Sequence, residues 1–161
     1  MSKIILGFDP GTEITGWALL KQDGPKVGLL SIGIIRTAAK ESVQAKLGNL
    51  LQEVFQLIEQ FHPDEIVVET QYVGINPKSA LTVAMARGVI LAGANIKKIG
   101  VFEYAPSEAK RGITGKGNAT KQQVQKMCSL IFGRSFDIPL DATDALALAY
   151  CHSNRLKIQK L

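Results

Sequence analysis

Cysteine is scarce in this chain, and it has no long apolar run. Its two cysteines, Cys128 and Cys151, lie far apart within apolar stretches, without the spacing of a disulfide framework. They therefore predict reduced core thiols and a cytoplasmic protein. The apolar run around residues 89–92 is interrupted by Arg87 and Lys97 and falls well short of the ~20 residues of a membrane span. We expect no membrane partner.

Targeting and repeat features are also missing. The first residues, Met1, Ser2 and Lys3, run directly into a strand pattern, without the apolar segment and cleavage site of a signal peptide. No internal repeat, linker or low-complexity stretch divides the chain, so its length predicts a single domain over residues 1–161. The segment 115–117 does not have the spacing of a Walker phosphate loop.

The charge balance is basic. The chain contains 19 Lys and Arg against 14 Asp and Glu, which gives a net charge of +5. Such a balance favours a polyanionic partner such as nucleic acid. A solvated basic surface would give the same composition, so charge alone leaves both interpretations open.

Hydrophobic periodicity predicts an α/β fold. Three apolar segments joined by short turns, 3–9, 14–21 and 27–37, form an antiparallel meander. The expected elements that follow are helix 43–61, strand 65–70, helix 78–94, strand 101–104 and two closing helices, 121–132 and 141–156. Residues 110–121 are interpreted as a basic loop. This order predicts a five-stranded mixed sheet, with the meander on one side, parallel strands on the other, and flanking helices.

Four carboxylates fall where the expected elements begin or end. Asp9 ends the first strand and Glu69 the fourth, so both emerge at one edge if these strands are parallel neighbours. Asp141 and Asp144 share one face at the start of the last helix. Taken singly, Asp9 fits a turn and the two helix acids fit the helix dipole. Glu69 directly follows an apolar strand, where an unpaired charge is costly. Their agreement on one edge favours a shared site.

Acidic side chains gathered at one edge would repel one another unless cations lay between them. Carboxylate oxygens suit Mg²⁺ or Mn²⁺. Two such ions about 4 Å apart can clamp a phosphodiester, one activating water and the other stabilising the leaving oxygen. His152, two turns beyond Asp144, is expected to be a packed or surface histidine and not a further ligand.

Short motifs are spread along nearly the whole chain: 5–12 with Thr15 and Gly16, Glu69 with Tyr72, 79–81, 86–88, 102–105 with Lys110, and 141–145. Together they resemble the RuvC family of Holliday junction resolvases. The resemblance runs from about Ile4 to Asn154 and keeps the family spacing. It implies a ribonuclease H-like fold, a homodimer, and Mg²⁺-dependent paired nicking of four-way DNA junctions in recombination and repair. It also implies a branch-migration motor of the RuvA and RuvB type as partner.

The same resemblance assigns roles to single residues. It implies two Mg²⁺ per active site, with Mn²⁺ as a possible substitute, held by four ligands: Asp9, Glu69, Asp141 and Asp144. It also implies that Lys110 and Lys121 are catalytically important loop lysines. Tyr72 falls where the family has an aromatic, usually Phe, that stacks on an unpaired base near the crossover.

Basic residues of the predicted loop are candidate DNA contacts. Lys110, Arg111, Lys116 and Lys121 could hold phosphates or stabilise developing charge. Arg111 and Lys116 are also compatible with a flexible exposed loop. An exposed aromatic such as Tyr72 stacks on a splayed base with ~1–3 kcal/mol. The small residues of helix 79–94 permit close approach to the sheet or to a partner subunit, and the resemblance favours the subunit.

Three other functions fit parts of the sequence. Residues 9–12 also resemble the first phosphate loop of the actin and sugar-kinase fold, but that fold needs two domains and a second glycine-rich loop. A related ribonuclease H-like nuclease for other branched DNA or RNA–DNA hybrids has the same acids, which alone leave this alternative open. A catalytically inactive DNA-binding module would gain nothing from carboxylates beside phosphate.

Overall fold

Five strands form one mixed sheet in a computed structural model that describes residues 2–70 and 76–158. The strand order is β3-β2-β1-β4-β5. β1 (Ser2–Asp9), β2 (Ile14–Asp23) and β3 (Lys26–Arg36) pair antiparallel, whereas β4 (Glu65–Glu69) joins β1, and β5 (Gly100–Tyr104) joins β4, in parallel. The predicted meander and parallel strands are both confirmed. Since Phe8 pairs with Val68, the next residues of the two strands leave the sheet at the same edge.

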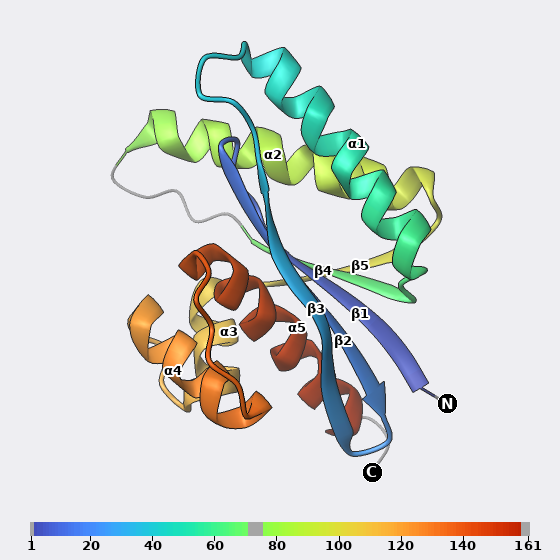
Figure 1. Cartoon of the computed structure of the whole chain (residues 1–161), viewed down its shortest axis with the longest axis vertical. Helices are drawn as coiled ribbons and strands as arrows, with labels where there is room; N and C mark the ends of the chain where they lie inside the picture. The colour runs from blue at the N-terminus through green and yellow to red at the C-terminus, as the bar shows by residue number, and fades with distance from the viewer. Residues whose placement is uncertain (1, 71–75, 159–161) are drawn as a thin grey trace.

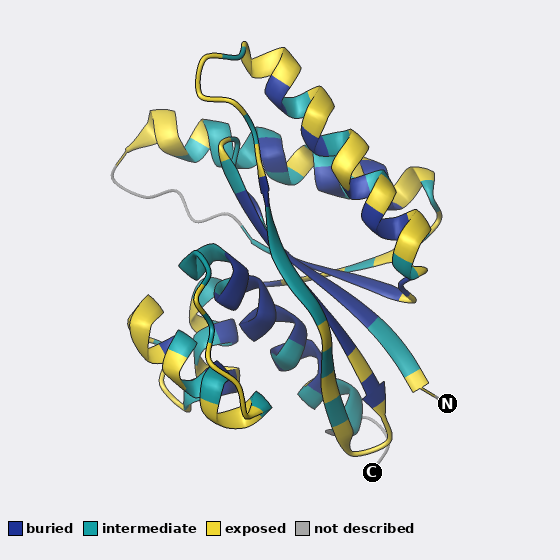
Figure 2. Cartoon of the chain, viewed as in Figure 1, coloured by how far each residue is buried: buried dark blue, intermediate teal, exposed yellow. Residues whose placement is uncertain are grey.

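Helices cover both faces of this sheet (Figure 1). One face carries α1 (Val43–Phe61) and α2 (Pro77–Ile96), and the other carries α3 (Pro106–Thr114), α4 (Lys121–Phe132) and α5 (Leu140–Ile158). Side chains alternate along β1, so Leu6 and Phe8 join the core under α1 and α2, whereas Ile5 joins the core under α5. The fully buried residues run through the central strands and the middle of α5 (Figure 2).

Residues 106–114 form a helix, α3, so the prediction of a loop from residue 110 is wrong. Pro106 occupies a first-turn position, where its missing N–H is not needed, and Gly115 ends the helix with a φ of 79°. Gly112 suggests a flexible loop in the sequence, yet here it lies against α5. A Cβ at Gly112 would come within 3.0 Å of the Cys151 Sγ. Close packing therefore accounts for this glycine, and the loop shrinks to residues 115–120.

α2 is more apolar than its internal Arg87 suggests. Within the part of the chain that the structure describes, it is the one helix whose length and composition would suffice to cross a membrane, with a mean hydropathy of 1.4. Its contacts are those of a helix packed in a globular fold, because Arg87 pairs with Glu103 of β5 and Gly93 lies against Leu51 of α1. Much of its apolar surface nevertheless remains uncovered.

Both cysteines are free and buried, which confirms that they are core thiols. The Cys128 Sγ lies 3.7 Å from the Thr143 carbonyl oxygen of α5, to which it donates. Burial raises the pKa of Cys128 to about 12, so this thiol stays protonated and unreactive near neutral pH.

Candidate active site

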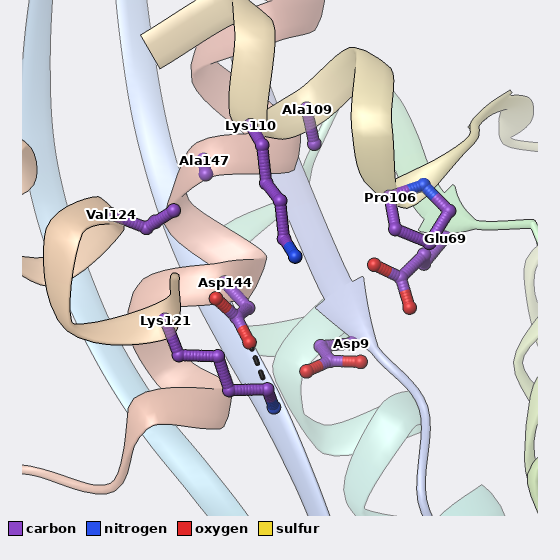
Figure 3. Close-up of a pocket in the computed structure, with 9 residues that line it drawn as sticks. All are labelled: Asp9, Glu69, Pro106, Ala109, Lys110, Lys121, Val124, Asp144 and Ala147. Atoms are coloured by element: carbon purple, nitrogen blue, oxygen red, sulfur yellow. Dashed lines mark ion pairs between the residues drawn. The ribbon is translucent and has the colours of Figure 1, made fainter. Parts of the chain in front are cut away.

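Three carboxylates converge on one cavity at the carboxyl edge of the parallel strands (Figure 3). Asp9 ends β1, Glu69 ends β4, and Asp144 lies in the first turns of α5. Lys110 of α3 and Lys121 of α4 enter the same cavity, which has a volume of about 150 Å³. The remaining lining residues are Pro106, Ala109, Val124 and Ala147. Acids from three elements and lysines from two others thus meet in one small, partly apolar space.

Glycines on the strands let α5 approach the sheet closely. A Cβ at Gly7 of β1 would lie 2.5 Å from the Ala145 carbonyl oxygen, and one at Gly16 of β2 would lie 1.9 Å from the Asp141 carbonyl oxygen. No side chain larger than hydrogen fits either contact. Because Gly16 pairs directly with Asp9, this contact sets how near the first turn of α5 comes to the end of β1.

Lys121 connects the cavity to both acids of α5. Its Nζ lies 2.9 Å from the Asp144 Oδ2 and 3.6 Å from the Asp141 Oδ1. The start of α4 is fixed by a reciprocal cap: Thr120 N donates to Gln123 Oε1 at 2.8 Å, and Gln123 N donates to Thr120 Oγ1 at 3.2 Å. Although burial opposes it, the hydrogen bond to Asp144 and the nearby acids raise the pKa of Lys121, which therefore stays charged.

Negative charge in the cavity is only partly balanced. Burial, followed by the charges of Glu69 and Asp144, raises the pKa of Asp9 well above its ordinary value. Burial and then Asp144 raise the pKa of Glu69 to about 7, and burial also raises the pKa of Asp144. Lys121 lowers all three pKa values without offsetting these effects. Further positive charge would therefore stabilise the ionised form of this site.

The chemistry of these side chains fits a divalent cation, whereas their spacing does not yet form a finished cage. Carboxylate oxygens are the ligands that Mg²⁺ and Mn²⁺ prefer. Across residues 2–70 and 76–158, no three Asp, Glu, His or Cys side chains lie close enough together to form a ready-made metal site. One oxygen of Asp144 is instead paired with Lys121, at 2.9 Å. A cation would draw the carboxylates together.

The other predicted site residues lie outside this cavity. Asp141 lines a second, wider cavity of about 470 Å³ between the β1–β2 turn and the start of α2, and it contacts Lys121 of the first site. Arg111 on α3 and Lys116 in the following loop are exposed and line neither cavity. Tyr72 lies outside the described residues.

Local sequence patterns do not predict two features of the site region. The glycine contacts beneath α5 depend on strand-to-helix distances, which no local pattern encodes. His152 is packed, as expected, but it also bridges Glu65 and Tyr104 by hydrogen bonds. The sequence places His152 on the same apolar helix as two acids, but this placement does not identify the hydrogen-bond partners of the histidine.

Comparisons with known proteins agree with this geometry. A model of the family described as "Crossover junction endodeoxyribonuclease RuvC" matches residues 5–152. A relative of that name from Chlamydia caviae is 42% identical over 162 residues, covering 96% of this chain and 94% of the relative. Another from Cytophaga hutchinsonii is 40% identical over 153 residues, covering 94% of this chain and 76% of the relative.

Solved structures show the same similarity. Thermus thermophilus RuvC in complex with a Holliday junction substrate matches with a TM-score of 0.89 at 27% identity, covering 98% of this chain and 96% of that one. The yeast mitochondrial Holliday junction resolvase Ydc2, at 17% identity and a TM-score of 0.65, shares the fold. The predicted ribonuclease H-like α/β fold is thereby confirmed.

Proposed function

Because the chain belongs to the RuvC family of crossover junction endodeoxyribonucleases, we propose that it resolves Holliday junctions by hydrolysing one phosphodiester bond in each of two opposed strands. The observation that carries this proposal is the meeting of three carboxylates and two lysines in one cavity. The Thermus thermophilus relative, whose structure contains a Holliday junction, has the same fold over nearly its whole length. This supports four-way DNA as the substrate here.

We assign the binding of divalent metal to the four acids Asp9, Glu69, Asp141 and Asp144. The raised pKa values of Asp9 and Glu69 support this role, since cations would keep both carboxyls ionised at neutral pH. Asp141 is included because it shares a helix face and the Lys121 contact with Asp144. We propose Mg²⁺, two ions per site, with Mn²⁺ as a substitute; when bound, they activate water and stabilise the leaving oxygen.

The lysines act on the phosphate. Lys110 reaches into the cavity from α3 and Lys121 from α4 (Figure 3). A DNA phosphate entering the cavity offers both ammonium groups new anionic partners, and charge that develops during hydrolysis strengthens these contacts. We assign backbone contacts to the exposed Arg111 and Lys116, in line with the net charge of +5. Base stacking by Tyr72 stays a prediction.

Paired nicking needs two active sites, and a two-fold homodimer supplies them. The uncovered face of α2 supports this assembly: Leu81 and Ile96 are 58% and 62% exposed, and the exposed small residues Gly88 and Ala92 lie on the helix between them. An interface between two copies would also explain the apolar composition of α2. Ala92→Glu should therefore dissociate the protein to monomers in sedimentation velocity.

The two hydrophobic cores lie on opposite faces of one sheet, which supports treating residues 1–161 as a single nuclease domain. A branch-migration motor of the RuvA and RuvB type is the proposed partner, and the buried free thiols fit the proposed cytoplasmic location.

The alternative is a related nuclease that acts on other branched DNA or on RNA–DNA hybrids. The test is nicking of a mobile four-way DNA junction with Mg²⁺, beside a linear duplex and an RNA–DNA hybrid of matched sequence. We expect paired symmetric nicks in the junction alone, abolished by EDTA. Lys121→Gln should slow them, whereas Lys126→Gln, an exposed lysine on the same helix, should not. Comparable cleavage of the hybrid would overturn the junction proposal and keep the metal site.

A further inference from the structure

A buried chain of hydrogen bonds runs between α5 and the parallel strands. His152 of α5 is 2% exposed, and both of its ring nitrogens have partners. Its Nε2 lies 2.8 Å from Glu65 Oε2 at the start of β4, and its Nδ1 lies 2.7 Å from the Tyr104 hydroxyl at the end of β5. The other Glu65 oxygen accepts a hydrogen bond from Lys3 of β1. Three strands and one helix are thus connected through a single imidazole.

The direction of each hydrogen bond follows from the charges. Burial would raise the pKa of Glu65, but hydrogen bonds from Lys3 and His152 outweigh it and lower that pKa, so the carboxylate is ionised and accepts from the Nε2–H. Burial lowers the pKa of His152, so the ring is neutral and its Nδ1 has a free lone pair. Tyr104, whose pKa burial raises, therefore donates its hydroxyl proton to Nδ1. One tautomer and one hydroxyl orientation satisfy every group.

Tyr104 connects this hydrogen-bond network to α3, the helix that contains Lys110. The Arg155 guanidinium lies over the Tyr104 ring, 4.5 Å from its centroid, and its Nη2 donates to Glu108 Oε1 at 2.6 Å. The other Glu108 oxygen accepts from Ala105 N at 2.8 Å and so caps the start of α3. Lys110 follows on the same short helix and enters the cavity.

Tyr104 also touches the strand that ends in an acid. It pairs with Glu69 in the register of β4 and β5, and its carbonyl oxygen accepts from Thr70 N at 2.9 Å. The position of this tyrosine therefore bears on one lysine and one carboxylate of the cavity together. Because each donor in this network has an acceptor, the hydrogen bonds fix one arrangement of the three side chains, which favours a role in fixing geometry.

We propose that Tyr104, His152 and Glu65 are positioning residues for cleavage, which hold the end of β5 and the start of α3 so that Lys110 faces Glu69 and Asp144. The inference rests on the proposed role of Lys110 in the nuclease. Because none of the three touches the cavity, their loss should slow the chemical step and leave junction affinity unchanged.

The first test removes one hydroxyl. Tyr104→Phe keeps the ring under Arg155 but breaks the bond to His152, and a small displacement of a reacting group is enough to slow chemistry by an order of magnitude or more. We expect a single-turnover cleavage rate about tenfold lower, with an unchanged dissociation constant for the junction. Tyr150→Phe is the matched control, because Tyr150 lies on α5 against Phe132 and is not part of this hydrogen-bond network. An unchanged rate in Tyr104→Phe would overturn the proposal.

A double-mutant cycle separates positioning from general loosening. In the Lys110→Gln background, Tyr104→Phe should slow cleavage by less than about twofold, while its effect on the melting temperature stays as in the wild type. Multiplied rate losses would overturn the inference, since the hydroxyl would then act independently of Lys110. An unchanged rate in Lys110→Gln alone would overturn both the role of this lysine and the inference.

A spectroscopic arm needs no substrate and so remains informative if junction nicking itself fails. The chain has two histidines, His62 and His152, so ¹⁵N spectra of the imidazoles of the whole protein contain two sets of signals. His152 should show a single neutral tautomer protonated at Nε2, and Tyr104→Phe should shift its Nδ1 resonance. A tautomer protonated at Nδ1 in the wild type would overturn the network.

Discussion

Strand β4 begins with Glu65 and ends with Glu69, and its two ends differ in how they treat a carboxylate. At the first end, burial is outweighed by hydrogen bonds from Lys3 and His152, and the pKa of Glu65 is lowered. At the other end, burial and the charge of Asp144 act together and raise the pKa of Glu69 to about 7. The charge of the glutamate at the start of β4 is thus fully compensated by its hydrogen-bond donors, whereas the glutamate at the end of β4 lacks sufficient positive charge nearby.

The difference separates two uses of charge within one sheet. The compensated end needs nothing from outside, because its donors and acceptors are paired within the chain. The cavity end lowers the stability of the protein until a cation or a phosphate-bound metal arrives, a pattern typical of functional sites.

The largest expected effect concerns activity at the cavity end. Asp9→Asn and Glu69→Gln remove a proposed metal ligand without changing side-chain size, so cleavage should fall by about 10³-fold or more. Junction binding, measured by gel shift in Ca²⁺, should persist, because the lysines and exposed basic residues remain. Loss of binding in both variants, with the fold intact, would contradict the assigned roles.

Stability should respond to the two glutamates with opposite signs. Glu65→Gln removes the carboxylate that accepts hydrogen bonds from the buried His152 and from Lys3, and should lower the free energy of unfolding by about 2–3 kcal/mol. Glu69→Gln removes repulsion and should raise it by about 1 kcal/mol in EDTA. Urea unfolding of the metal-free proteins measures both. If Glu69→Gln also destabilised the protein, the cavity end would not be short of positive charge.

Gly16→Ala should disturb the cavity end alone. The added Cβ would lie 1.9 Å from the Asp141 carbonyl oxygen, so the start of α5 must move and carry its acids away from Asp9. We expect a loss of about 2 kcal/mol of stability and a reduced cleavage rate. Gly28→Ala on β3, where a Cβ meets no atom within 4 Å, is the control and should change neither quantity. Full activity in Gly16→Ala would show that the acids tolerate a shift of α5.

The smallest effect is a difference in pH dependence. The pKa of Glu69 is raised from 4.5 to about 7, so its contribution to stability is present at acid pH and is lost as the pH rises through this range. The pKa of His152 is lowered from 6.5, so its contribution is present above pH 6.5 and is lost as the pH falls through its folded-state pKa. The contributions of the two ends to stability therefore change with pH in opposite directions.

Melting curves in EDTA between pH 4.5 and 7 can resolve this opposition. Glu69→Gln should gain stability relative to the wild type as the pH rises, by about 1 kcal/mol at pH 7. The stability deficit of His152→Gln relative to the wild type should instead shrink as the pH falls. Parallel curves for the wild type and both variants would show that neither group titrates differently in the folded protein.

The sequence is sufficient to predict the cavity end but not the compensated end. Asp9 and Glu69 each follow an apolar strand, and parallel pairing brings strand ends together, so their convergence follows from local patterns. The pairing of Glu65 with His152 joins residues 87 positions apart, and no periodicity reveals it. Local pattern predicts a loop at Gly112 because it does not reveal that this residue packs against Cys151 of α5.

Asp141 shows a further limit of pattern reasoning. Its spacing from Asp144 correctly predicts a shared helix face, but the start of α5 turns that residue toward a second cavity. Lys121 contacts both acids, and only the position of α4 decides this. Spacing predicts which residues lie near one another, whereas packing decides which of them line the same cavity.

α5 carries the proposed ligand Asp144 near its start and His152 two turns later, about 12 Å along the same helix. A packed helix moves as one body, so a shift of its first turn when a cation draws the acids together also shifts the imidazole. His152 is therefore a built-in reporter. Its ring resonances should record the loading of the active site from a distance, before any DNA is present and without a probe attached to the protein.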